Sequence, residues 1–187
     1  MEFILFAPLL IILFMGMADV VNYVSTLRKL NTSAELMADL VTHRGPFINA
    51  SEIDDFFVGA ELALTPIPIS NVRITVFGYF RNPVTKNAEL RWSRSSTSAR
   101  VNGNAMTNGA TAPTCADPDT VRLTPLTENS DIVVVVVCAN YVPPRVTILD
   151  MVNILGFSSK LIRREIVMRP LQSATLTCRP PTGQPNC

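Results

Sequence analysis

Residues 3–24 read FILFAPLLIILFMGMADVVNYV, and this stretch decides the fold class because no charge interrupts it before Asp19. A helix over residues 3–18 would be about 24 Å long, and its continuation to Val24 covers the roughly 30 Å hydrocarbon core of a bilayer. We therefore predict a transmembrane helix segment over residues 1–24. A cleavable secretory signal is the alternative, because Gly16-Met17-Ala18 has the small-x-small pattern of a cleavage site, although no Lys or Arg precedes the apolar run.

The apolar pattern continues past this segment in a different form. Beyond Asp19, apolar residues recur every three or four positions, which is the spacing of one helix face. The stripe that we expect to pack on a sheet includes Leu27, Leu30, Ala34 and Met37. Gly45-Pro46 ends the helix, because proline lacks an amide and disfavours helical structure in the residue before it. Residues 25–44 are thus predicted to be an amphipathic continuation of the first helix.

Strand patterns dominate the rest of the chain. Residues 131–141 (DIVVVVVCANY) predict a central strand, since consecutive valines suit a strand that is buried on both faces. Residues 71–80 and 88–94 alternate apolar and polar side chains around an Arg81-Asn82-Pro83 turn, which predicts a hairpin. A last strand is expected over residues 161–168.

Two shorter helices are expected, one before the first of these strands and one between the last two. The first has a capped start near residue 49, where either Asn49 with Glu52 or Ser51 with Asp54 can form the reciprocal cap. The second covers residues 148–155, where apolar residues repeat at helical spacing. The predicted fold class is α+β, with a long N-terminal transmembrane and amphipathic helix packed on a small antiparallel sheet. Residues 45–170 form its extracytoplasmic domain with a mobile loop at 95–119, and residues 171–187 form a Pro-rich tail.

Composition excludes several classes of function. The 187 residues include 16 basic and 15 acidic side chains, so no basic surplus exists to attract nucleic acid, and we expect no nucleic-acid partner. Only 17% of the residues are charged and 48% are apolar, against about 25% charged in soluble domains. This balance indicates that part of the chain lies in lipid or against a partner.

The sequence contains no pattern typical of catalysis. His43 is the sole histidine, it has no neighbouring cysteine, and its place at a helix end accounts for it as a helix C-terminal cation. The Asp54-Asp55 pair and Asp117-Pro118-Asp119 offer oxygen ligands, but neither has the ligand count and glycine of a calcium loop. We expect no catalytic, cofactor-binding or metal-binding residues. The main interpretation of these aspartates is that they are solvated turn residues, and calcium binding is the alternative.

Four cysteines lie beyond the apolar helix, at positions 115, 138, 178 and 187. Their spacing differs from the paired C-x-x-C of zinc sites, so we favour disulfides in an oxidising compartment over four inert thiols. Three pairings are possible. Shorter loops close more readily, which favours Cys115 with Cys138 and Cys178 with Cys187.

Several segments carry a family resemblance. The N-terminal group comprises Glu2-Phe3, Ala7-Pro8-Leu9-Leu10 and Gly16 followed by an acid at Asp19. The distal group comprises LTPIP (64–68), NVRITVFGYF (71–80), ELRWSR (89–94), VVVVVCANYVPP (133–144) and IVMRP (166–170). On these segments the chain resembles the TadE/TadG-like family, the minor pilins or pseudopilins of Tad (Flp) pilus systems. The resemblance touches most of the chain outside residues 95–119.

The resemblance implies a structural subunit that acts in the assembly or at the tip of a type IV-like pilus and supports adhesion. It implies other pilin subunits, the pilus assembly platform and membrane lipid as partners, and a single-pass place in the bacterial inner membrane with a periplasmic distal domain. It also implies that Glu2 acts in assembly, by pairing with the N-terminal amine of a neighbouring subunit. An incidental acid at the membrane interface is the alternative interpretation of Glu2.

The sequence departs from the pilin pattern in one respect. A prepilin peptidase site has a glycine shortly before the glutamate, whereas Met1 alone precedes Glu2 here, so either the site lies upstream of this sequence or processing does not occur. Arg28 and Lys29 also follow the apolar segment, which by the positive-inside rule would place the distal side in the cytoplasm. We give the cysteines more weight than these two charges. The second functional interpretation is an inner-membrane-anchored extracytoplasmic binding module that never enters a filament.

Overall fold

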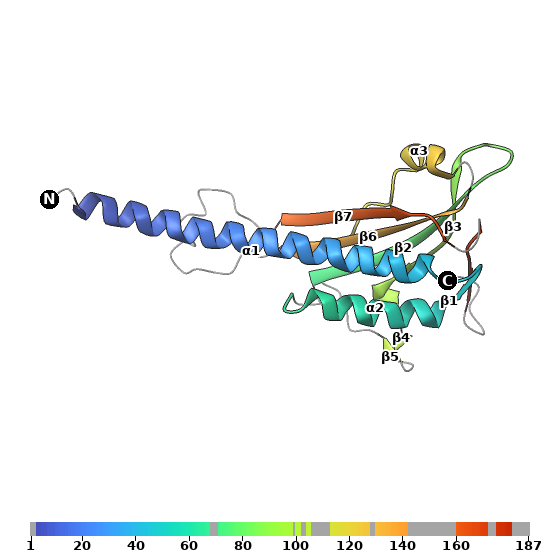
Figure 1. Ribbon diagram of the computed structural model, residues 1–187, viewed down its shortest axis with the longest axis horizontal. Coiled ribbons are helices and arrows are strands. Elements are labelled where there is room, and N and C mark those ends of the chain that lie inside the picture. Colours follow the sequence, from blue (N-terminus) through green and yellow to red (C-terminus); the bar gives the residue numbers. More distant parts are fainter. Residues whose placement is uncertain are drawn as a thin grey trace.

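The computed structural model of the chain describes residues 3–67, 71–98, 100–101, 104–105, 113–127, 130–141, 160–171 and 175–180. Its fold is α+β, with a long helix packed on a small antiparallel sheet, as the sequence predicts (Figure 1). The helices are α1 (Phe3–Thr42), α2 (Ala50–Leu64) and α3 (Thr120–Leu123), with 3-10 turns η2 (Ser96–Ser98) and η3 (Thr124–Thr127). The strands are β1 (Phe47–Asn49), β2 (Val72–Arg81), β3 (Ala88–Ser95), β4 (Arg100–Val101), β5 (Asn104–Ala105), β6 (Ile132–Tyr141), β7 (Lys160–Met168) and β8 (Thr177–Arg179).

The main sheet has four strands in the order β3-β2-β6-β7, and each neighbouring pair is antiparallel. The valine strand β6 is central, because β2 and β7 pair with its two edges. In this register Val135 lies between Val76 of β2 and Ile166 of β7. The predicted hairpin is the β2–β3 pair, and its connection runs through residues 82–87.

Both faces of β6 are buried, which explains its run of valines. Alternate residues of a strand point to opposite faces. Val133, Val135 and Val137 lie in one core cluster with the helices α1 and α2, whereas Val134 and Val136 lie in a second cluster on the outer face. The outer face is the face of the main sheet that points away from α1. The outer cluster also contains Leu123 of α3, so the segment around α3 covers part of this face.

Asn49 is the N-cap of helix α2, where the first of the two predicted caps occurs. The Glu52 carboxylate accepts the backbone N–H of Asn49 at 3.0 Å, which is the reciprocal half of a capping box. The helix then runs back along α1, since Ser33 Oγ donates to the Ala60 carbonyl at 3.2 Å and Lys29 Nζ donates to the Thr65 carbonyl at 2.6 Å. Two antiparallel helices therefore cover one face of the sheet (Figure 1).

The β2–β3 hairpin contains a close approach that requires glycine. A Cβ atom at position 78 would overlap the Trp92 ring, which lies directly over Gly78. Trp92 Nε1 in turn donates to the Leu176 carbonyl at 3.2 Å, so the ring connects the hairpin to the C-terminal segment. The strand pairing shifts register between Gly78 and Tyr79, next to this contact.

The regions expected to be irregular contain ordered pieces. Within the predicted mobile loop 95–119, the structure describes η2, the short β4–β5 pair and residues 113–119, and the disulfide from Cys115 to Cys138 ties the last of these to the outer face. Within the predicted tail 171–187, strand β8 pairs in parallel with β1, which the sequence pattern does not indicate. The predicted helix at 148–155 lies outside the described residues.

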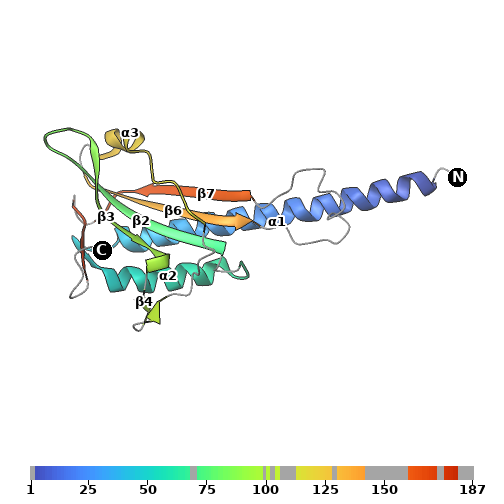
Figure 2. The ribbon, with the colours of Figure 1, turned by 180° about the vertical axis from the view of Figure 1, so that it is seen from behind.

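Helix α1 divides into two halves (Figure 2). The C-terminal half lies on the sheet, and the N-terminal half extends past the end of the sheet without another described element beside it. In the described part of the chain, no helix has the length and hydropathy of a membrane span.

Candidate functional site

The predicted packing stripe of α1 lies at the centre of the core. Leu30, Ala34 and Met37 have no exposed surface and share one core cluster with Val135 of β6. Leu27 is partly buried and packs against the same cluster. This half of α1 is therefore part of the core of the distal domain. The predicted assembly residue, Glu2, lies outside the described residues.

The projecting half of α1 has the opposite character. Its large apolar side chains stand in solvent, and they include Phe6 (61% exposed), Phe14 (69%) and Val21 (61%). The change occurs near Tyr23, whose ring meets Tyr141 of β6 edge-on with 5.3 Å between the ring centroids. Contiguous exposed apolar surface of this kind is typical of a site that contacts lipid or other proteins.

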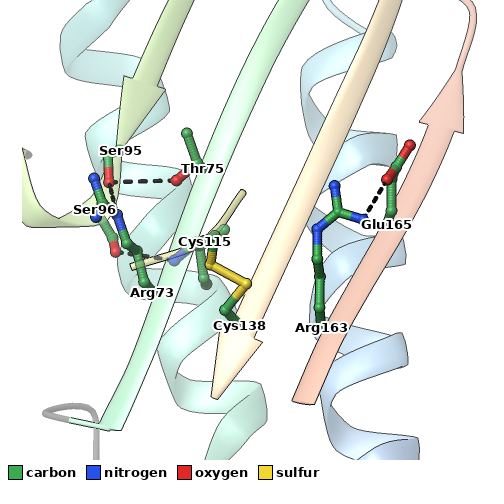
Figure 3. Close-up of a disulfide and its surroundings, with 9 residues drawn as sticks. Arg73, Thr75, Ser95, Ser96, Cys115, Cys138, Arg163 and Glu165 are labelled. Carbon is green, nitrogen blue, oxygen red and sulfur yellow. Dashed lines mark hydrogen bonds and ion pairs between the residues drawn. A yellow bond between two sulfur atoms is a disulfide. The ribbon is translucent and has the colours of Figure 1, made fainter. Parts of the chain in front are cut away.

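The disulfide from Cys115 to Cys138 confirms the predicted pairing of these two cysteines. Cys138 lies on the outer face of β6, and Cys115 belongs to the segment that crosses this face (Figure 3). Cys178 is also disulfide-bonded, and its predicted partner, Cys187, lies outside the described residues. Among the described cysteines none is a free thiol.

A polar depression of about 200 Å³ lies on the outer face beside this disulfide. Its lining residues are Arg73, Thr75 and Phe77 of β2, Ser93 and Ser95 of β3, and Cys115 and Asp117 of the covering segment. The strand residues are alternate ones, which is why their side chains share a face. The hairpin therefore forms the floor of the depression, and the disulfide-bonded segment forms a wall.

Hydroxyl groups organise the floor around Arg73. Arg73 Nε donates to Ser95 Oγ at 3.2 Å, and Thr75 Oγ1 donates to the same oxygen at 3.4 Å (Figure 3). Ser95 Oγ also lies 3.0 Å from Thr97 Oγ1, where either hydroxyl can be the donor. The bond to Ser95 holds the Arg73 guanidinium against the neighbouring strand β3.

Charge on the outer face is mixed. Arg163 and Glu165 of β7 form an ion pair at 2.8 Å on the far side of the disulfide from Arg73 (Figure 3). Burial raises the pKa of Tyr79 to about 12, and the negative charges of Asp117 and Glu165 act in the same direction. The Tyr79 phenol is therefore neutral at physiological pH.

Asp131 anchors the C-terminal segment at the end of the sheet opposite the depression. Asp131 accepts the backbone N–H of Leu176 at 3.0 Å and pairs with Arg91 at 2.9 Å. Burial raises the pKa of the Asp131 carboxyl, and the Leu176 N–H and the Arg91 charge oppose that rise. With the Trp92 bond to the Leu176 carbonyl, these contacts fix both backbone groups of a buried residue, which is a structural role.

Asp54, Asp119 and His43 have structural partners. Both carboxylate oxygens of Asp54 accept from Arg94, at 2.9 and 2.7 Å, in a pair that is almost fully buried between α2 and β3. Asp119 caps α3 by accepting the Val121 N–H at 3.0 Å, and His43 lies 3.0 Å from the Asp39 carboxylate. The described residues contain no group of three or more His, Cys, Asp or Glu side chains that could hold a metal ion.

Sequence reasoning identified the packing stripe and the cysteines but missed the depression. The alternation of Arg73 and Thr75 with apolar neighbours is visible in the sequence, and it indicated a half-buried strand with a polar face. The predicted pairing of Cys115 with Cys138 brings the segment that contains Asp117 to this face, but no sequence pattern shows that Asp117 and Arg73 line one depression.

Comparison of the chain with protein-family models, with curated proteins and with solved structures finds no match.

Proposed function

We propose that this chain is a minor pilin or pseudopilin of the TadE/TadG-like kind, a structural subunit that acts in the assembly or at the tip of a Tad (Flp) pilus. In this proposal α1 anchors the subunit as a single-pass protein in the bacterial inner membrane, with the distal domain in the periplasm. During assembly the same helix packs among the helices of other subunits. The partners are therefore membrane lipid, sister subunits and the assembly platform.

The division of α1 into two halves is the observation that carries the proposal. A helix of 40 residues is about 60 Å long, far more than the sheet needs for cover. One half is buried on the sheet, and the other half exposes Phe6, Phe14 and Val21. Such side chains favour an apolar environment by about 1.5–3 kcal/mol each when they are fully buried. A bilayer and a bundle of sister helices both supply that environment.

The sequence of the projecting half supports lipid as the first environment. Residues 3–18 are uncharged, and Asp19 and Asn22 follow at the point where the helix approaches the distal domain. Polar residues at that depth would lie near an interface, where a charge costs much less free energy than at the bilayer centre. The disulfide from Cys115 to Cys138 supports an oxidising compartment for the distal domain.

Glu2 is the residue that we assign to assembly. A carboxylate at a helix N-terminus is stabilised by only about 0.3–1 kcal/mol, which neither makes nor breaks a membrane anchor. Inside a dry bundle of helices the same carboxylate needs a cationic or amide partner, or must become neutral. A neighbouring subunit that presents its N-terminal amine would provide that partner.

The test compares Glu2→Ala with Glu35→Ala in cells that express the full chain. Glu35 is an exposed acid on the packed half of α1, so its loss removes the same charge from the same helix without removing the N-terminal carboxylate. We expect both variants to accumulate in the membrane fraction, and only Glu2→Ala to abolish pili in electron micrographs. Normal piliation with Glu2→Ala would favour the alternative interpretation, in which Glu2 is an incidental acid at the membrane interface, and would weaken the proposal.

The alternative is a membrane-anchored binding module whose helix never leaves the bilayer, and the polar depression on the outer face favours it. Both functions place the distal domain in the periplasm, so an alkaline phosphatase fused after His43 should be active in either case. An inactive fusion contradicts both. Release from the membrane distinguishes the two functions, because only a pilus subunit appears in filaments sheared from the cell surface.

A further inference from the structure

We infer that the free edge of strand β7 binds an extended segment of another protein, one that carries a carboxylate opposite Arg164. Strand β7 is the last strand in the sheet order β3-β2-β6-β7, and its nine residues pair with β6 along one edge (Figure 1). In the described part of the chain no strand lies along its other edge, which we call the free edge. This interaction goes beyond the anchoring and assembly role proposed above, and it does not require the projecting half of α1.

The free edge has the features of a strand-binding surface. An unpaired edge strand presents a row of backbone N–H and C=O groups, on which a strand of another chain can form a hydrogen-bonded ladder. At nine residues β7 is longer than the usual strand of about five or six. Ile166 and Met168 pack against the core beneath the sheet but are only partly buried, so an added strand would cover apolar surface that they leave open.

Arg164 determines which segment can pair there. Its neighbours on the same face, Ile162 and Ile166, pack in the core cluster that contains α1, so by alternation the Arg164 side chain points to the α1 side of the sheet. Its Nε is buried and has no hydrogen-bond partner in the described part of the chain, and a buried donor without an acceptor is unfavourable. On an added strand the opposite residue would lie about 4.5–5.5 Å away between Cβ atoms, within reach of the guanidinium. A carboxylate at that position would form a charge-assisted hydrogen bond.

The other charges of β7 do not supply this carboxylate. The strand contains three basic residues and one acidic residue, Glu165. Glu165 points to the outer face and already pairs with Arg163 at 2.8 Å. The positive charge of Arg164 is therefore uncompensated within its own strand. Charge complementarity favours an acidic partner.

A second copy of β7 does not meet this requirement in antiparallel pairing. A two-fold axis perpendicular to the sheet aligns residues of the same face. Arg164 would then oppose its own counterpart or, after a shift of two residues, an isoleucine. Glu165 lies on the other face and cannot oppose it. We therefore assign the free edge to an acid-bearing strand of a different protein.

The experiment measures peptide binding to the full chain, kept in solution with mild detergent, by fluorescence anisotropy. The probe is a labelled peptide with the nine-residue length of β7, which alternates valine and threonine and has aspartate at its centre. Two control peptides carry asparagine or lysine at the centre. A third keeps the aspartate but has methylated backbone nitrogens that cannot donate to a ladder. The variants are Arg164→Gln and Arg164→Glu, and the matched control is Arg122→Gln, which removes an exposed arginine of α3.

We expect saturable binding of the aspartate peptide to the natural chain. Binding should be about tenfold weaker for the asparagine peptide, and about tenfold weaker for the aspartate peptide with Arg164→Gln, because each change removes one charge-assisted hydrogen bond. Arg164→Glu should prefer the lysine peptide. Methylation of the backbone should remove binding, and Arg122→Gln should leave it unchanged.

Absence of saturable binding of the aspartate peptide overturns the inference. Equal binding of the lysine or the methylated peptide overturns it as well, and so does a loss with Arg122→Gln as large as that with Arg164→Gln. Self-association of the natural chain that Arg164→Gln abolishes would identify a second copy as the occupant, which also contradicts the inference. The comparison of peptides uses the natural chain, so it decides the matter even if a variant fails to fold. None of these measurements involves pili, so this inference and the proposed function fail separately.

Discussion

Gly78→Ala should lower the stability of the fold, and Gly59→Ala should raise it. A Cβ at position 78 would overlap Nε1 and neighbouring ring atoms of Trp92, whereas a Cβ at position 59 meets nothing within 4 Å. Trp92 is 7% exposed and bonded to Leu176, so its ring cannot move away without loss of packing and of that hydrogen bond. Gly59 lies inside helix α2, where alanine is the better helix former.

The size of each effect follows from these environments. Forcing extra volume into a packed core costs about 1–3 kcal/mol, and loss of the indole hydrogen bond adds about 1 kcal/mol, so Gly78→Ala should lower the free energy of unfolding by roughly 2–4 kcal/mol. Gly59→Ala should raise it by about 0.5–1 kcal/mol. Urea unfolding of the full chain in detergent, followed by circular dichroism, measures both.

The double variant Gly78→Ala with Trp92→Leu tests the cause. Leucine lacks the ring that the new Cβ would strike, so alanine at position 78 should cost far less in the Trp92→Leu background than in the natural chain. An equal cost in both backgrounds would refute the reasoning. So would a Gly78→Ala variant as stable as the natural protein.

Three further predictions concern buried or charged groups. Leu30→Asp should destabilise the fold by more than about 3 kcal/mol and cause aggregation on heating, because Leu30 is fully buried. Asp54→Ala should cost about 3–5 kcal/mol by leaving Arg94 without its carboxylate partner, and the double change of Asp54 and Arg94 to Leu should recover most of this loss in urea melts. Because the folded-state pKa of Tyr79 is about 12 and the unfolded value is about 10, stability should fall between pH 10 and 12 by at most about 3 kcal/mol, and Tyr79→Phe should remove this component.

The parts of the fold that the sequence predicts are those set by local pattern. The valines at 133–137 suit a strand buried on both faces, and the structure places β6 between β2 and β7 with a core on each side. The spacing of Leu30, Ala34 and Met37 put these residues on one stripe of α1, and all three lie in the core. In both cases the spacing of apolar residues along one segment determines which side chains are buried.

The parts that the sequence did not predict depend on segments that are distant along the chain. Asp54 was assigned to a cap or a turn, yet its partner is Arg94 on another element. The pairing of β1 with β8 joins three-residue strands with little pattern of their own, and it is fixed by long-range contacts such as Thr177 N donating to the Pro46 carbonyl at 2.9 Å. The depression likewise requires the hairpin and residues 115–117 together.

The projecting half of α1 and the outer face of the sheet lie on different parts of the molecule. The apolar half of α1 extends past the end of the sheet, and the packed half covers the face that contains Val135. The depression around Arg73 lies on the opposite face, so a ligand there does not compete with α1 for the sheet. A subunit held by its helix in a bilayer or a filament could therefore still present the outer face. Changes at Glu2 should therefore alter assembly while leaving the outer face unchanged, because the described part of α1 packs on the other face of the sheet.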